Sequence, residues 1–160
     1  MATDRPAFSD VVDARKRIAG FLSPTATNNY PSLDKLLGCT VWVKHENHHP
    51  TSAFKVRGGL NLCAALSAQG ELSALYAAST GNHGQSVAYA ARAFGAPAKI
   101  FVPENSNPDK VRAIRHLGAE VVAFGKDYEV CRHRAEQVAL EQGARFVDGG
   151  NEPHLIAGVG

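Results

Sequence analysis

The sequence lacks the features that mark membrane, secreted and nucleic-acid-binding proteins. No apolar run approaches the ~20 residues that a helix needs to cross a bilayer, and the N-terminus has no apolar stretch of the kind found in secretory signals. Lysine and arginine number 17 against 15 aspartates and glutamates, and the basic residues form no block. We therefore expect no nucleic acid and no membrane as a partner, and we expect a cytoplasmic protein.

Cysteine is also scarce in the sequence. The three residues, Cys39, Cys63 and Cys131, are widely separated and odd in number. Their spacing matches no metal site. We expect reduced thiols, most of them buried as small apolar side chains.

The sequence does contain a regular alternation of short apolar runs and helical patterns. Such alternation is typical of βαβ units, in which a parallel sheet is buried on both faces. We therefore expect an α/β fold with open parallel sheets and flanking helices, and ligands beyond the carboxyl ends of the strands. For one helix, Asn107 is the expected N-cap, Pro108 the first helical residue and Gly118 the stop. The predicted strands are residues 75–78, 98–102, 120–124 and 145–147.

The pattern is less regular outside this region. Residues 10–17 are predicted to form a short helix, and residues 23–33 are turn-forming and irregular. Residues 40–44 read as a strand with no evident neighbour. Residues 152–157 resemble the start of a helix that nothing caps. The unpaired strand and helix lead us to expect that the sequence is the first part of a longer protein.

Lys55 directly follows Phe54 at the predicted start of a helix that Gly70 ends. A cation at this position lies against the positive end of the helix dipole, which costs up to about 1 kcal/mol, and Arg57 adds a like charge nearby. Both effects favour the neutral amine, the form that makes Schiff bases with carbonyl compounds. The alternative is an ordinary solvated surface lysine.

Residues 79–85, STGNHGQ, form a polar turn between the first predicted strand and an Ala-rich helix. Ser79 or Thr80 can cap that helix through a hydroxyl, and Gly81 lets the backbone turn tightly and a ligand come close. The N–H groups at the helix start then point at an anion, such as a carboxylate or a phosphate. The alternative is an ordinary capped turn without a ligand.

Residues 45–49, HENHH, fit the letters H-E-x-x-H of the zinc peptidases. That chemistry needs both histidines on one face of a helix. Here the segment follows a strand-like run, and Pro50 disfavours a helical conformation at His49. An extended chain would hold His45 and His49 too far apart for one ion, so we expect no metal site here.

Three segments together closely resemble the fold type II pyridoxal-phosphate enzymes, with threonine/serine dehydratases (ammonia-lyases) and serine racemases as the nearest members. The resemblance extends from about residue 23 to residue 160, and its two central motifs are specific in combination. The segments are KHENHHPTSAFKVRGG, ASTGNHGQSVAYAA and VPENSNPDKVRAIRHLGAEVV.

The resemblance implies roles for the residues of these motifs. Lys55 would form a Schiff base with the aldehyde of pyridoxal 5'-phosphate, Phe54 would pack near the cofactor ring, and Asn82 would hydrogen-bond the ring hydroxyl. In the racemases, a serine at the position of Thr80 is the acid and base on the face opposite the lysine. The substrate carboxylate would be held, largely by backbone N–H groups, at Ser79, Thr80, Gly81, Asn82 and His83.

The sequence departs from the family pattern at three places. Thr80 keeps the hydroxyl of the racemase serine but is bulkier and stiffer at χ1, which leaves the choice open and favours a dehydratase. His49 stands where a glutamine is common, and Ser52 stands where glycine is usual. The last two departures concern the substrate more than the cofactor.

The family architecture consists of two α/β domains with the cofactor between them. We expect residues 1–67 to be the first part of the larger domain, residues 68–151 the complete smaller domain, and residues 152–160 the start of the return into the larger one. The family's Gly-rich phosphate loop, its pyridine-nitrogen partner and its usual divalent-cation ligands have no counterpart here. For the full-length protein we expect a homo-oligomer, because apolar surface on an incomplete domain favours association.

Four functional hypotheses follow. The favoured one is a pyridoxal-phosphate-dependent dehydratase that converts L-threonine, L-serine or a related β-hydroxy amino acid to a 2-oxo acid and ammonia. The second is a serine racemase. The third is an inactive fragment or binding module that lacks the phosphate-binding half of the site. The fourth, a zinc peptidase, conflicts with the expected geometry of residues 45–49.

Overall fold

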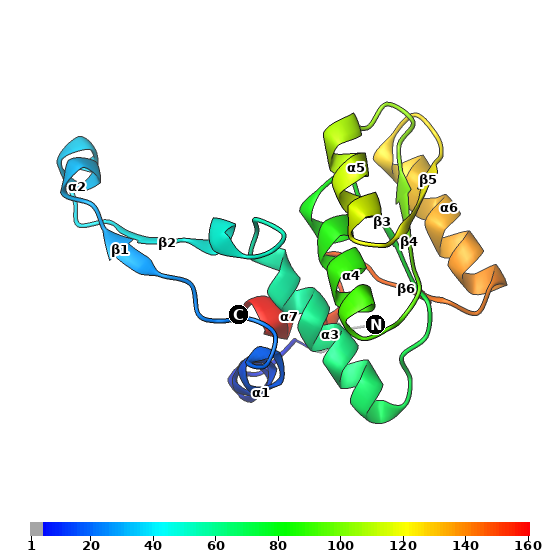
Figure 1. Ribbon diagram of the computed structural model, residues 1–160, viewed down its shortest axis with the longest axis horizontal. Coiled ribbons are helices and arrows are strands. Elements are labelled where there is room, and N and C mark those ends of the chain that lie inside the picture. Colours follow the sequence, from blue (N-terminus) through cyan, green and yellow to red (C-terminus); the bar gives the residue numbers. More distant parts are fainter. Residues whose placement is uncertain (1–4) are drawn as a thin grey trace.

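The computed structural model describes residues 5–160 of the chain, with seven α-helices, one 3-10 helix and six strands in that part. Figure 1 shows a four-stranded sheet between helices, and an arm that extends away from it. The elements are α1 (Phe8–Ile18), β1 (Thr27–Asn29), α2 (Pro31–Leu37), β2 (Trp42–Lys44), η1 (Glu46–His48), α3 (Lys55–Gln69), β3 (Leu75–Ala78), α4 (Asn82–Ala93), β4 (Ala98–Val102), α5 (Pro108–His116), β5 (Glu120–Ala123), α6 (Tyr128–Glu141), β6 (Arg145–Phe146) and α7 (Pro153–Val159).

The larger sheet has the strand order β5-β4-β3-β6, and all neighbouring strands are parallel. Leu75 lies opposite both Ala98 and Arg145, so β3 is a central strand. Helices α4 and α5 cover one face of the sheet and α6 covers the other (Figure 1). The expected α/β fold with a parallel sheet and flanking helices is confirmed.

Successive residues of the central strands enter two different apolar cores. Leu75 and Ala77 pack with α3 and α4, whereas Tyr76 and Ala78 pack with α6. A strand alternates its side chains between the faces of a sheet, so a run that is apolar throughout is explained by helices on both faces. The first core also crosses the expected domain boundary at residue 68, because α3 and the sheet contribute to it together.

The helix boundaries in this part of the chain follow from local chemistry. The Asn107 side chain accepts a hydrogen bond of 2.8 Å from the Asp109 N–H, Pro108 occupies the first turn, and Gly118 has φ +94°. The Asp127 carboxylate likewise accepts from the Val130 N–H at 3.0 Å at the start of α6. These contacts satisfy groups that a helix leaves without partners at its ends.

The arm consists of β1, α2 and β2, and here two expectations were wrong. Residues 23–33 are not irregular throughout, since they contain β1 and the start of α2. The strand at residues 42–44 does have a neighbour, because β1 pairs with it in antiparallel fashion. The turn-rich composition gave no sign of β1, because contacts with other segments stabilise this strand. Asn29 Nδ2 donates hydrogen bonds to both carboxylate oxygens of Asp34 in α2 and to the backbone carbonyl of Val41.

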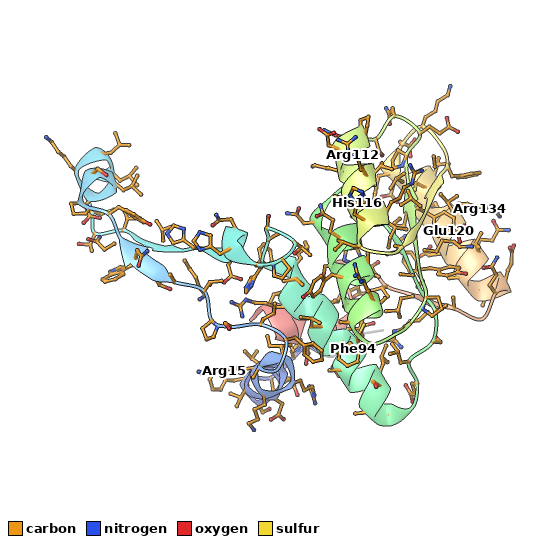
Figure 2. All side chains as sticks on the ribbon, in the orientation of Figure 1. Arg15, Phe94, Arg112, His116, Glu120 and Arg134 are labelled. Carbon is orange, nitrogen blue, oxygen red and sulfur yellow. The ribbon has the colours of Figure 1, made fainter. Side chains whose placement is uncertain are left out.

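Helix α3 lies at the centre of the molecule and packs on α1, α4 and α7. Phe94, labelled in Figure 2, lies just after α4, and its ring centroid is 4.9 Å from that of Phe21 beyond the end of α1. Two of the three cysteines, Cys63 and Cys131, are buried as expected, and Cys39 is exposed. Within residues 5–160, every helix is too short or too polar to traverse a bilayer.

Candidate functional site

Lys55 is the first residue of α3 and follows a tight turn. The Ser52 N–H donates to His49 O at 2.7 Å, and Ser52 has φ +53°, a left-handed conformation that glycine adopts without strain. The half-buried Lys55 side chain has its Nζ 5.6 Å from the ring centroid of Phe54. The chain therefore holds the amine against an aromatic ring at a helix N-terminus.

Lys55 also lines a small cavity of about 40 Å³. Its walls come from the starts of α3 and α4, from the segment after β6, and from α7. The cavity is far smaller than the ~300–1,000 Å³ of ordinary ligand pockets. The lining residues are Lys55, Gly58, His83, Gly149, Leu155, Ile156 and Val159.

The turn after β3 presents free backbone donors. Ser79 is buried, and its Oγ accepts a hydrogen bond of 3.1 Å from the Gly81 N–H. Ser79 therefore closes the turn and does not cap α4, which has no side-chain cap at all. Within residues 5–160, the N–H groups of Asn82, His83 and Gly84 have no hydrogen-bond partner. Free donors of this kind at a helix N-terminus are suited to an anion.

A direct contact holds the two motifs together. Ser86 Oγ on α4 donates a hydrogen bond of 2.6 Å to the backbone carbonyl of Lys55. Next to it, a Cβ on Gly59 would lie 2.7 Å from Ser86 O, so only glycine permits this approach of α3 and α4. Sequence reasoning missed Ser86, although a buried serine on the apolar face of an Ala-rich helix was a signal that could have been used.

His83 is mostly enclosed and is turned toward the end of the sheet. Its Nε2–H donates to Val147 O at 3.0 Å, and the ring packs on Gly149. Burial is the main factor that lowers the pKa of His83, and the charge of Lys55 lowers it further. The imidazole is therefore neutral at pH 7, and its Nε2 is already occupied.

The remaining candidate side chains are open to solvent. Thr80 and Asn82 are exposed, and Phe54 is 46% exposed. An added Cβ on Gly81 would meet only Lys110 Nζ, at 3.7 Å, so the backbone of the turn is accessible to a ligand. The structure thus brings Lys55 and His83, which lies in the first turn of α4, to the same small cavity, and Thr80 lies exposed just before that helix.

The histidines of residues 45–49 lie next to different groups. His45 Nε2 lies 2.7 Å from the Tyr30 hydroxyl, whereas His49 Nε2 lies 3.1 Å from a carboxylate oxygen of Glu46. Glu46 and His48 bound a 3-10 helix rather than an α-helix. In the part of the chain that the structure describes, no three histidine, cysteine or carboxylate side chains converge on a metal-sized site.

Comparison with known proteins gives consistent matches. The family model described as pyridoxal-phosphate dependent enzyme matches residues 18–160. An L-threonine ammonia-lyase of Thermotoga maritima is 36% identical over 153 residues, which are 96% of this chain and 38% of that protein. A serine racemase of Schizosaccharomyces pombe is 30% identical over 155 residues, which are 97% of this chain and 48% of that protein.

Solved structures agree with these relatives. A threonine deaminase of T.th. superposes with a TM-score of 0.84 at 34% identity, over 96% of this chain and 48% of that one. A pyridoxal 5'-phosphate-dependent aspartate racemase superposes with a TM-score of 0.89 at 28% identity, over 99% of this chain and 49% of that one. The chain spans less than half of the length of each of these four relatives.

Proposed function

This chain belongs to the family of pyridoxal-phosphate dependent enzymes, and on that basis we propose that it carries the lysine side of a dehydratase active site. The proposed reaction converts L-threonine, L-serine or a related β-hydroxy amino acid to a 2-oxo acid and ammonia. The observation that carries this proposal is the hydrogen bond from Ser86 to the Lys55 carbonyl. It joins the amine-bearing helix to the helix whose N–H groups are free.

The described residues fit part of the cofactor and its substrate. Lys55 supplies an amine for an aldehyde, and Phe54 supplies an exposed apolar ring beside it. The unpaired N–H groups of Asn82, His83 and Gly84 suit a carboxylate. The exposed Asn82 side chain is free to bond a ring hydroxyl.

In the proposed mechanism, the residues of this chain bind, orient and move a proton. The turn holds the substrate carboxylate through its N–H donors, and Lys55 Nζ accepts the proton from the substrate α-carbon. When bound, the cofactor supplies an electron sink for the charge that develops at that carbon. His83 is largely enclosed, and burial lowers its pKa, so its neutral imidazole adds no positive charge beside the amine of Lys55.

Racemisation is the second candidate, and one observation favours it. The Thr80 side chain is exposed next to the free N–H groups and has no hydrogen-bond partner among residues 5–160, so its hydroxyl is available to donate a proton. Incubation with L-serine separates the two reactions, since a dehydratase releases pyruvate and a racemase releases D-serine.

The 160-residue chain alone is proposed to bind the cofactor weakly and to turn over little. Helix N-termini are the usual holders of phosphate, and here the α4 N-terminus is assigned to the carboxylate. We propose that residues 1–67 and 152–160 belong to the larger domain and residues 68–151 to the smaller one. Association of the full-length protein is supported by the exposed Leu36, Leu37 and Trp42. A cytoplasmic location stays a prediction.

The proposal is tested by visible absorbance and by product analysis. Added pyridoxal 5'-phosphate is expected to give a band for covalently bound cofactor that Lys55→Ala removes and Lys35→Ala, at an exposed position on α2, does not. A band that survives Lys55→Ala would show that Lys55 is the wrong residue. Brisk pyruvate formation by the isolated chain would refute the expected need for further phosphate-binding residues.

A further inference from the structure

Glu46 connects three segments of the chain that meet just before Lys55. Its Oε1 accepts hydrogen bonds from Thr25 Oγ1 at 2.5 Å and from Arg57 Nη2 at 2.8 Å, and its Oε2 accepts from Arg57 Nε at 2.7 Å. Thr25 precedes β1, Glu46 begins η1, and Arg57 lies in the first turn of α3. We call Thr25, Glu46, His49 and Arg57 the Glu46 clamp.

Glu46 and Arg57 form a bidentate, charge-assisted ion pair, which is among the stronger hydrogen-bonded interactions in proteins. About four-fifths of each side chain is buried, with exposed fractions of 20% and 18%. The hydrogen bonds from Arg57 are the main factor that lowers the pKa of Glu46, to about 2. The carboxylate therefore stays ionised over the working pH range, and the charge of Arg57 is balanced. Arg57, which was expected to add a like charge near Lys55, is thus paired with Glu46.

The clamp spans the turn before α3 and the first turn of that helix, which have few stabilising contacts of their own. Helix α3 has no side-chain cap at its N-terminus. The preceding turn contains Ser52 in a left-handed conformation, which costs energy for a residue other than glycine. Glu46 on one side and Arg57 on the other fix the two ends of this turn. The backbone of Lys55 lies between them, so its position depends on that bond.

His49 is the titratable member of the clamp. It is 6% exposed, and its Nε2 lies 3.1 Å from Glu46 Oε2 without a hydrogen-bond partner in the described chain. The charged groups that face it are Glu46 from η1, Arg57 from α3 and Lys44 from β2. His49 and the exposed His48 both line a surface pocket that also contains Thr25. Burial, and after it the charge of Arg57, lowers the pKa of His49.

Protonation of His49 would change the balance of charges in the clamp. Glu46 would then face three cations, since Lys44 Nζ is already 3.7 Å from its Oε1. His49 would compete with Arg57 for Oε2 and repel it. We propose that the Glu46–Arg57 pair positions Lys55, and that His49 loosens this pair when it gains a proton. The inference rests on the proposed role of Lys55 as the cofactor-binding amine.

The test measures how fast individual lysines are labelled. The 160-residue protein is treated with pyridoxal 5'-phosphate and borohydride from about pH 8 to about pH 5, and peptide mapping gives the labelling rate of Lys55 relative to the exposed Lys35 and Lys126. Glu46→Gln is expected to lower the relative rate of Lys55 at every pH, by roughly tenfold or more, because a small displacement of a reacting group is costly. Arg57→Lys keeps the positive charge but cannot make the bidentate hydrogen bond to Glu46. Its relative labelling rate at Lys55 is expected to lie between those of the parent protein and Glu46→Gln.

His49→Gln isolates the effect of pH. In the parent protein, the relative rate of Lys55 is expected to fall once the pH drops below the lowered pKa of His49, and in His49→Gln this fall is expected to disappear. Circular dichroism checks that each protein is folded, and His49→Gln decides the matter if Glu46→Gln unfolds. An unchanged rate in folded Glu46→Gln, or a fall that persists in His49→Gln, overturns the inference.

The same data separate this inference from the proposed function. Labelling of Lys55 that is faster than that of Lys35 but insensitive to Glu46 overturns only the role of the clamp. Labelling of Lys55 that is no faster than that of Lys35 in the parent protein overturns the proposed function, and the inference with it.

Discussion

Gly59→Ala provides a stringent test of how α3 and α4 are joined. Alanine has the higher helix propensity, so the substitution would stabilise an isolated helix by about 1 kcal/mol. In this structure, however, the new Cβ would lie 2.5 Å from Ser86 Oγ and 2.7 Å from Ser86 O. The backbone oxygen cannot rotate away, so α4 itself must move.

The expected cost follows from these distances. Restoring ordinary contact requires a shift of roughly 0.7 Å between the helices, and overpacking of this kind costs about 1–3 kcal/mol. The hydrogen bond from Ser86 to the Lys55 carbonyl would be weakened, which costs about 1 kcal/mol more. After the gain in helix propensity, Gly59→Ala is expected to lower the free energy of unfolding by about 1–3 kcal/mol.

Urea unfolding followed by circular dichroism measures this change. Gly20→Ala is the matched control, because Gly20 has no positive φ and an added Cβ there would meet nothing within 4 Å. The control is expected to be stabilised by about 0.4–1 kcal/mol through the unfolded state. If Gly59→Ala is stabilised as well, the close approach of α3 and α4 does not exist as described.

Three further predictions concern local features. Ser52→Gly is expected to raise the free energy of unfolding by about 0.5 kcal/mol, because relief of the left-handed strain slightly exceeds the entropy that glycine adds to the unfolded chain; a decrease in urea unfolding would contradict this. Asn107→Ala removes the cap of α5 and is expected to cost about 1 kcal/mol, whereas no change would mean that the cap is not formed. Burial lowers the pKa of both His49 and His83 below the usual 6.5, so the unfolded chain binds protons first as the pH falls. The free energy of unfolding should therefore decrease from about pH 6.5 toward the folded pKa values, and less steeply in His49→Gln; an identical slope in that variant would refute the assignment.

Much of the sheet could be predicted from the sequence because its strands are apolar throughout. Residues 75–78 and 98–102 were predicted with the bounds of β3 and β4, and the other two strands end one residue earlier than expected. Parallel strands buried on both faces have a distinctive composition, and glycines such as Gly118 end the intervening helices. These signals are local, so a single sequence contains them.

The arm and the clamp could not be predicted in the same way. Strand β1 consists of Thr27, Asn28 and Asn29; asparagine is depleted in strands, and the pairing of β1 with β2 is not local. The bonds of Glu46 to Thr25 and Arg57 likewise join residues 21 and 11 positions apart. Such contacts depend on the path of the whole chain and not on any short pattern.

The candidate site could be predicted only in part from the sequence. The motifs around Lys55 and the turn at residues 79–83 could be identified from their letters and from the resemblance to a family. The hydroxyl of Ser79 was assigned to the helix cap as one option, but it bonds the Gly81 N–H within the turn. The contact from Ser86 was not foreseen, because it depends on the exact approach of two helices.

The most direct test asks whether the amine of Lys55 and the N–H groups that begin α4 face one cleft. Pyridoxal 5'-phosphate is trapped on the ¹⁵N-labelled chain with borohydride, and the amide signals are compared before and after by nuclear magnetic resonance. The account predicts label on Lys55 together with shifted amide signals for Asn82, His83 and Gly84. Label on Lys55 that shifts only the signals of its own helix, and leaves those three amides unchanged, would contradict it.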